Sequence, residues 1–120
     1  MAGSNNLGFK RLINAFGFSM QGFKAAYKHE EAFRQEVFAL ALAIPLGIWL
    51  GENAVEIILL IGSVLLLLVV ELLNSAVEAT VDRFGGEHHE LSGRAKDMAS
   101  AAVLIMTITA VMTWLLIIFF

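Results

Sequence analysis

The sequence contains no cysteine and one proline, and only 16% of its 120 residues are charged. Without cysteine the chain has no disulfide bond, no thiol nucleophile and no thiolate metal site. Two phosphate-binding patterns are also missing, because Gly85-Gly86 and the stretch Gly93-Arg94-Ala95-Lys96 satisfy neither the Walker A pattern nor the glycine-rich loop of protein kinases. Any nucleotide chemistry on this chain must therefore use another arrangement.

Hydrophobic residues are abundant, at 58% of the chain, and they gather in long runs. Such runs are typical of an α-helical membrane protein, and a chain of this length is expected to form one domain. We therefore predict an all-α membrane protein with a single membrane domain over residues 1–120. The expected elements are an amphipathic surface helix over 8–33, transmembrane helices over 34–50, 55–84 and 98–120, and a cytoplasmic loop over 85–97.

Between Phe9 and Tyr27, apolar residues recur at helical spacing, while basic residues lie largely on the other side. This pattern predicts a basic amphipathic helix in the membrane surface, with a break near Gly17 or Gly22. An amphipathic helix packed on a soluble core is the alternative interpretation. Three hydrophobic segments follow it in the chain, and they favour the membrane.

The basic residues indicate the topology. The first hydrophobic run, residues 37–50, is 14 residues long, short of the ~20 that a spanning helix needs. If it crosses the membrane, all 8 Lys and Arg residues lie on one side; a re-entrant segment would divide them five against three. The positive-inside rule therefore favours three spans, with the N-terminus inside and the C-terminus outside. We expect the first span to be completed by helix running back through residues 34–36.

Two helix starts carry capping signals. Asn53 is followed three residues later by Glu56, which predicts a capping box at the start of the second membrane helix. Ser92 is the expected N-cap of the third membrane helix.

An acidic stripe runs along the second membrane helix. At about 100° per residue, one face carries Glu71, Asn74, Ser75, Glu78 and Asp82. A carboxylate within hydrocarbon costs ~2.5–3.5 kcal/mol, so we expect Glu71 to face protein or water and to have a function. We interpret the stripe as an active-site wall. The alternatives are that Glu71 is a hydrogen-bonding group between helices and that Glu78 and Asp82 form a solvated helix end.

Three polar groups meet at the same membrane boundary: the acidic stripe, the charged run 28–36, and Lys96-Asp97. Clustered carboxylates without thiols favour a hard cation such as Mg²⁺. A carboxylate at lipid level can accept a proton from a lipid alcohol. His88-His89 resembles a metal pair, but adjacent histidines point apart on a helix, and a solvated loop is the better interpretation. The residues alone predict a membrane enzyme acting on a lipid and leave the reaction open.

Three stretches resemble the prokaryotic diacylglycerol kinases: EEAFRQE (30–36), ELLNSAVEATVDR (71–83) and EHHELSGRAKD (87–97). The likeness covers nearly the whole chain and includes GFKRLINAFGFS (8–19). It implies a multi-pass protein of the bacterial inner membrane that transfers the γ-phosphate of ATP to diacylglycerol and forms phosphatidic acid. It also implies a homotrimer with active sites shared between subunits, and no nucleic-acid partner.

The resemblance also implies roles for individual residues. Glu71 matches the general base, Asn74 matches a polar residue of the active-site wall, and Glu30 and Glu78 match magnesium ligands. The positions that match nucleotide contacts are Arg11, Phe18, Glu87, His88, His89, Lys96 and Asp97. The positions that match lipid contacts are Ala15, Phe16, Ser19, Met20, Ala32, Arg34, Gln35, Glu36, Trp49, Ser100 and Trp114. The chain departs from the family at Phe18, where a tyrosine is familiar, and at His88, which replaces a common small residue.

Two other functions fit parts of the pattern. One is a kinase of the same fold that accepts a different lipid alcohol, such as undecaprenol, because the sequence places Glu71 only at headgroup level. A non-catalytic membrane subunit could instead carry protons on Glu71. The additional acids and Lys96 at the water boundary have no role in that second alternative.

Overall fold

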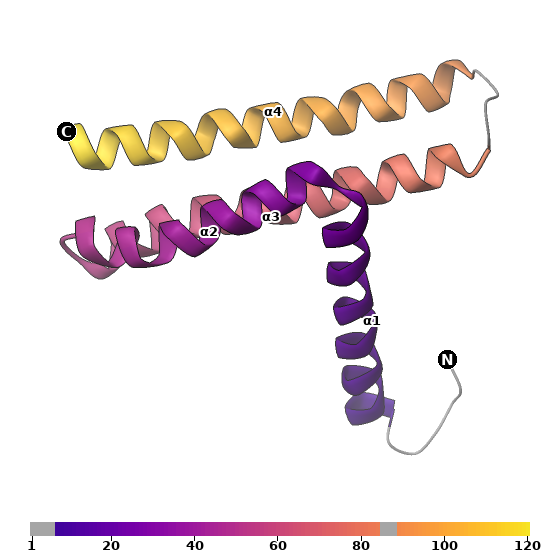
Figure 1. Cartoon of the computed structure of the whole chain (residues 1–120), viewed down its shortest axis with the longest axis horizontal. Coiled ribbons are helices and arrows are strands. Elements are labelled where there is room, and N and C mark those ends of the chain that lie inside the picture. Colours follow the sequence, from indigo (N-terminus) through magenta and orange to yellow (C-terminus); the bar gives the residue numbers. More distant parts are fainter. Residues whose placement is uncertain (1–6, 85–88) are drawn as a thin grey trace.

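The computed structural model describes residues 7–84 and 89–120, and these residues form four helices with short connections (Figure 1). The helices are α1 (Leu7–His29), α2 (Glu31–Leu50), α3 (Ala54–Asp82) and α4 (Glu90–Phe119). Figure 1 shows α2, α3 and α4 running alongside one another, whereas α1 leaves them steeply. The predicted all-α fold is therefore confirmed.

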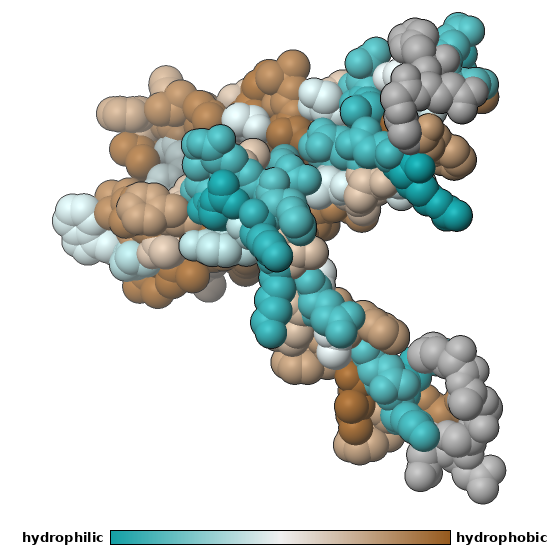
Figure 2. All heavy atoms as spheres, turned by 45° about the vertical axis from the view of Figure 1, so that its right-hand side comes forward, coloured by the Kyte–Doolittle hydropathy of each residue, from teal (hydrophilic) through white to brown (hydrophobic). Residues whose placement is uncertain are grey.

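Three helices are long and apolar enough to cross a membrane: α2 with 20 residues, α3 with 29 and α4 with 30. At ~1.5 Å per residue, 20 residues match the ~30 Å hydrocarbon core of a bilayer. The short first run reaches this length because α2 extends back through residues 34–36, as expected, and then three residues further, to Glu31. Figure 2 shows hydrophobic residues over much of the left-hand end of the bundle. Hydrophilic residues gather at the corner with α1 and at the right-hand end of the bundle.

The boundary between the first two helices differs from the prediction. The expected helix over 8–33 ends at His29, because Glu30 adopts extended backbone angles (φ −118, ψ 109) and the chain turns there. The Arg34 guanidinium donates hydrogen bonds to the carbonyls of Tyr27 (2.7 Å) and Lys28 (3.2 Å), which lie in the last turn of α1. The break expected near Gly17 or Gly22 is also wrong, since α1 continues through both residues.

The capping box at the start of α3 is confirmed. Asn53 Oδ1 accepts from the Glu56 amide (2.9 Å), and Glu56 Oε1 accepts from the Glu52 amide (3.1 Å), one residue before the expected one.

The loop predicted over 85–97 is wrong in its second half, because α4 begins at Glu90 and contains the whole of the expected span 98–120 up to Phe119. His89 is the N-cap in place of Ser92, since its Nδ1 accepts from the Leu91 amide (3.0 Å). The first turn is also supported by a Glu90–Arg94 ion pair (3.7 Å) one helical turn apart.

The central helix is α3, which packs against both α2 and α4. Leu60 is its fully buried side chain, and the Leu60 carbonyl accepts hydrogen bonds from Ser63 Oγ (3.0 Å) and from the Trp114 indole of α4 (3.0 Å). On the α2 side, Gly47 allows close approach, because a Cβ there would lie 2.9 Å from Ile61 Cγ1. Further along, Ala26, Phe33 and Leu68 form a core cluster that joins α1, α2 and α3. The middle of α3 is therefore held against the α1–α2 corner.

We predict that Gly47→Val lowers the free energy of unfolding by about 1–3 kcal/mol, because the added side chain overpacks the α2–α3 contact. Gly62→Val is the matched control, since a Cβ at Gly62 meets no atom within 4 Å. Unfolding of both variants in mixed micelles measures the difference. Equal stability of the two would contradict the close contact at Gly47.

Candidate active site

Glu71 lies at the centre of the candidate site and is only 4% exposed, on a helix of mostly apolar residues. Its burial follows from packing one turn earlier, where Leu68 joins the cluster with Phe33 and Ala26. The charges of Glu30 and Glu78 act on Glu71, and the charge of Glu71 acts on Glu36. Glu30 from the turn before α2, Glu36 from α2 and Glu78 from α3 therefore each lie near Glu71, and burial of such acids is unfavourable unless they are neutralised.

Three buried polar atoms in this region have no hydrogen-bond partner among the described residues: Glu36 Oε1, Asn74 Oδ1 and Ser75 Oγ. Buried polar groups are nearly always paired, so a cluster of unpaired ones around a buried acid points to a ligand. The Asn74 amide donates to Glu78 Oε1 (3.3 Å), and this bond turns its oxygen to the other side. Unused acceptors and one unused hydroxyl are thus concentrated around Glu71.

The available donors suit a hard divalent cation. Glu30 and Glu78 supply carboxylate oxygens, and Asn74 Oδ1 is an unpaired amide oxygen beside Glu78. Among the residues that the structure describes, no three His, Cys, Asp or Glu side chains are placed to hold a metal on their own. The protein would therefore provide part of the coordination, and phosphate oxygens and water would provide the rest, as is usual for Mg²⁺.

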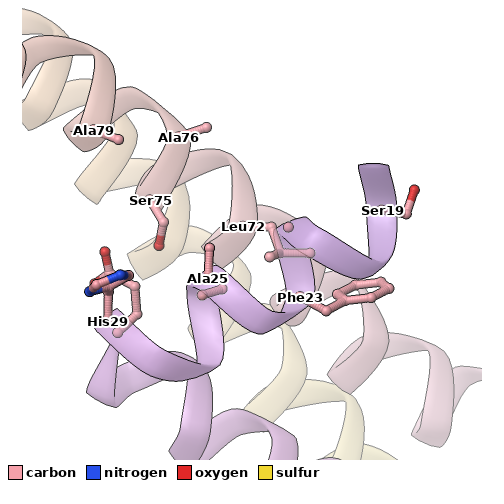
Figure 3. A pocket seen from close by; sticks show the side chains of 11 residues that line it. Ser19, Phe23, Ala25, His29, Leu72, Ser75, Ala76 and Ala79 are labelled. Atoms are coloured by element: carbon pink, nitrogen blue, oxygen red, sulfur yellow. The ribbon is translucent and has the colours of Figure 1, made fainter. Parts of the chain in front are cut away.

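A cavity of about 520 Å³ lies between α1 and α3 (Figure 3). Figure 3 shows Ser75 extending from α3 toward α1, where Ala25 and His29 lie. The wall is mostly apolar and consists of Ser19, Gly22, Phe23, Ala25, Ala26, His29, Glu30, Leu72, Ser75, Ala76 and Ala79. The cavity therefore borders the acidic cluster and is suited to an uncharged, mostly apolar group.

A second cavity, of about 660 Å³, is bounded by α1, α2 and α3. Lys24, Tyr27 and Lys28 contribute to its wall from α1, and the rest is apolar: Phe23, Phe33, Val37, Leu40, Leu65, Leu68, Val69 and Leu72. Phe23 and Leu72 line both cavities. The C-terminal half of α1 is thus flanked by two mostly apolar cavities.

Lys96 meets the far end of the acidic stripe. Its Nζ lies 3.1 Å from Asp82 Oδ1, and the two side chains are 44% and 65% exposed. This ion pair joins the start of α4 to the end of α3. It places a cation at the solvent end of the stripe.

Several predicted residues lie away from this cluster within one chain. The exposed residues Arg11, Ala15, Phe16, Phe18 and Met20 line neither cavity, and the first part of α1 projects away from the other helices (Figure 1). Trp49 is 78% exposed near the end of α2. Trp114 bonds to Leu60, which is ~16 Å from Glu71 along α3.

The remaining predicted residues have varied surroundings. Ser19 lines the cavity between α1 and α3, and Arg34 closes the end of α1. His89 caps α4, and Glu87 and His88 lie outside the described residues. The exposed positions are Ala32, Gln35, Asp97 and Ser100.

Sequence reasoning did not predict the cavity: His29 was noted only as part of the charged run 28–36, and Gly22 only as a place for a break in the first helix. For Ser75 a signal existed, because it lies on the acidic stripe four residues after Glu71. For Gly22 there was none, since its place in the wall depends on how α1 meets α3.

Comparison with known proteins gives a consistent result. The family described as prokaryotic diacylglycerol kinase matches residues 17–118. A diacylglycerol kinase of Escherichia coli K12 is 57% identical over 111 residues, which cover 92% of this chain and 91% of the relative. That of Haemophilus influenzae is 54% identical over 113 residues (94% and 96%), and that of Pseudomonas aeruginosa is 49% identical over 107 residues (89% and 87%).

We predict that Asp82→Asn changes the free energy of unfolding by less than about 1 kcal/mol, because exposed ion pairs contribute little. Glu90→Gln, which removes the exposed Glu90–Arg94 pair within α4, is the matched control and should behave alike. Unfolding of both variants in mixed micelles measures this. A loss above ~2 kcal/mol for Asp82→Asn alone would mean that Lys96 and Asp82 are buried in the assembled protein.

Proposed function

Because the chain belongs to the prokaryotic diacylglycerol kinase family and is a diacylglycerol kinase, we propose that the acidic cluster around Glu71 is where it phosphorylates its lipid. The kinase family implies ATP as the phosphate donor. The observation that carries this proposal is the burial of Glu71 beside Glu30, Glu36 and Glu78, in a helix apolar enough to cross a membrane. A water-borne donor and a membrane-borne acceptor can meet there.

In the proposed reaction Glu71 acts as the general base. Its carboxylate takes the proton from the free hydroxyl of diacylglycerol while that oxygen forms a bond to the γ-phosphorus of ATP. The bond from this phosphorus to the oxygen that it shares with the β-phosphate breaks. ADP is thereby released, and the phosphorylated lipid is phosphatidic acid. Phosphoryl transfer asks mainly for alignment and for stabilisation of negative charge, so it needs no Walker loop.

Glu30 and Glu78 would hold Mg²⁺, which supplies compensation for the phosphate charge when it is bound. Asn74 supports this role because its amide donates to Glu78 and leaves its own oxygen unpaired beside it. Lys96 is the second cation, and it would exchange its exposed bond to Asp82 for a phosphate oxygen.

We further propose that the protein lies in the bacterial inner membrane, with the N-terminus inside, the C-terminus outside and α1 on the membrane surface. The distribution of basic residues supports this orientation. A homotrimer with shared sites is supported by the separation of Arg11 and Phe18 from Glu71 within one chain. It is also supported by α4, in which Ala110 is the one buried residue.

We predict that Glu71→Gln lowers kcat for phosphatidic acid formation by at least ~10²-fold, because the amide cannot accept the proton. The assay uses the purified protein in lipid with labelled ATP, Mg²⁺ and diacylglycerol. Glu52→Gln is the control, since this exposed acid lies at the opposite end of α3. Full turnover by Glu71→Gln would remove the proposed base.

We predict that Glu30→Gln and Glu78→Gln each raise the Mg²⁺ concentration that gives half-maximal activity by ~10-fold or more, because each removes one charged ligand. Glu31→Gln is the matched control, because it makes the same change at an exposed neighbour of Glu30. An Mg²⁺ titration of the lipid-kinase rate measures the effect. Unchanged titrations for both variants would exclude these residues as the metal ligands.

A further inference from the structure

Among the described residues, Ser75 carries the one hydroxyl that is both shielded from solvent and without a hydrogen-bond partner. Ser19, Thr80, Thr107, Thr109 and Thr113 each donate to the carbonyl four residues earlier, at distances of 2.7–2.9 Å. Ser75 Oγ has no partner, although it is shielded from solvent and Ser75 lines the cavity between α1 and α3 (Figure 3). Its hydrogen-bonding capacity is therefore not used within the described chain.

The wall of this cavity restricts what it can hold. Five lining residues are small, namely Gly22, Ala25, Ala26, Ala76 and Ala79, and none of the lining residues is a lysine or arginine. Glu30 adds a carboxylate, which repels anions. A phosphate therefore does not fit, whereas an uncharged apolar group with one hydrogen-bond acceptor does.

We propose that Ser75 donates a hydrogen bond to an ester carbonyl of the acceptor lipid, whose glycerol backbone occupies this cavity. The inference rests on the proposed function, in which Glu71 receives the proton of the lipid hydroxyl. Ser75 lies four residues after Glu71, and side chains so spaced on a helix are about 5–6 Å apart. In diacylglycerol the free hydroxyl and the nearest ester carbonyl are only a few bonds apart. One lipid can therefore reach both residues.

The Ser75 hydroxyl can turn into the cavity, because rotation about the Cα–Cβ bond moves it from one staggered rotamer to another. Since water has little access to the Oγ atom, a carbonyl that reaches it replaces no existing bond. A lipid without the carbonyl would leave the hydroxyl unpaired. Ser75 is therefore a residue that selects ester lipids over ether lipids.

The first test compares diacylglycerol with dialkylglycerol of the same chain length, which has the same alcohol and no ester carbonyl. Ser75→Ala should lower kcat/KM for diacylglycerol by roughly 10-fold, the contribution of one hydrogen bond, and leave kcat/KM for dialkylglycerol unchanged. Thr80→Ala is the control, because that hydroxyl is exposed and already bonded to Ala76. Equal losses of Ser75→Ala on both lipids, or no loss on diacylglycerol, would overturn the proposal.

The second test fills the cavity without relying on Ser75. A Cβ at Gly22 meets no atom within 4 Å, so Gly22→Leu should fold and occupy part of the cavity. We expect KM for diacylglycerol to rise roughly 5–100-fold with KM for ATP unchanged. Gly8→Leu in the same helix, which is also unobstructed and lies outside the cavity, should leave both constants unchanged. An unchanged lipid KM for Gly22→Leu would exclude the cavity as the lipid site.

The two levels of inference fail in different ways. If the unaltered protein forms phosphatidic acid and Glu71→Gln does not, the proposed function stands whatever Ser75→Ala shows. If Glu71→Gln keeps full turnover, Glu71 is not the base, and the Ser75 proposal, which places the lipid hydroxyl at Glu71, fails with it.

Discussion

The structure depends on keeping a carboxylate buried within an apolar helix. Glu71 is 4% exposed in α3, and three further acids lie near enough to interact with it. In a low-dielectric setting such a cluster is unfavourable unless protons or cations neutralise it. The fold maintains it through packing, since Phe33, Leu68 and Ala26 hold the α1–α2 corner against α3. In the proposed function, stability is exchanged for a site that attracts a metal ion and its phosphate ligands.

In the proposed function, the arrangement of the helices separates the two reactants. Apolar cavities lie between the second half of α1 and the helices α2 and α3. Lys96 and Asp82 lie at the exposed end of the acidic stripe on α3. A greasy acceptor can therefore approach Glu71 from one direction and a charged donor from the other. The small side chains between α1 and α3 keep this space open.

The sequence predicted what depends on local pattern. Hydrophobic runs indicated three spans, Asn53 and Glu56 indicated the start of α3, and helical periodicity placed Glu71 and Glu78 on one face. Prediction from the sequence failed where a helix end depends on a contact between residues several positions apart. Arg34 donates a hydrogen bond to the Tyr27 carbonyl, and α1 ends earlier than predicted. The cavity lay beyond prediction because its shape depends on the angle between α1 and α3. The separation of Arg11 from Glu71 likewise follows only from the direction that α1 takes (Figure 1).

The turn at Glu30 has a mechanical consequence. This residue is both the joint between α1 and α2 and, in the proposed function, one of two magnesium ligands. Any tilt of α1 relative to the bundle displaces its carboxylate from Glu78, which is fixed on α3. In the proposed function, a tilt of α1 would therefore change the spacing of the two magnesium ligands, so that the membrane surface on which α1 is proposed to lie would act on the metal site.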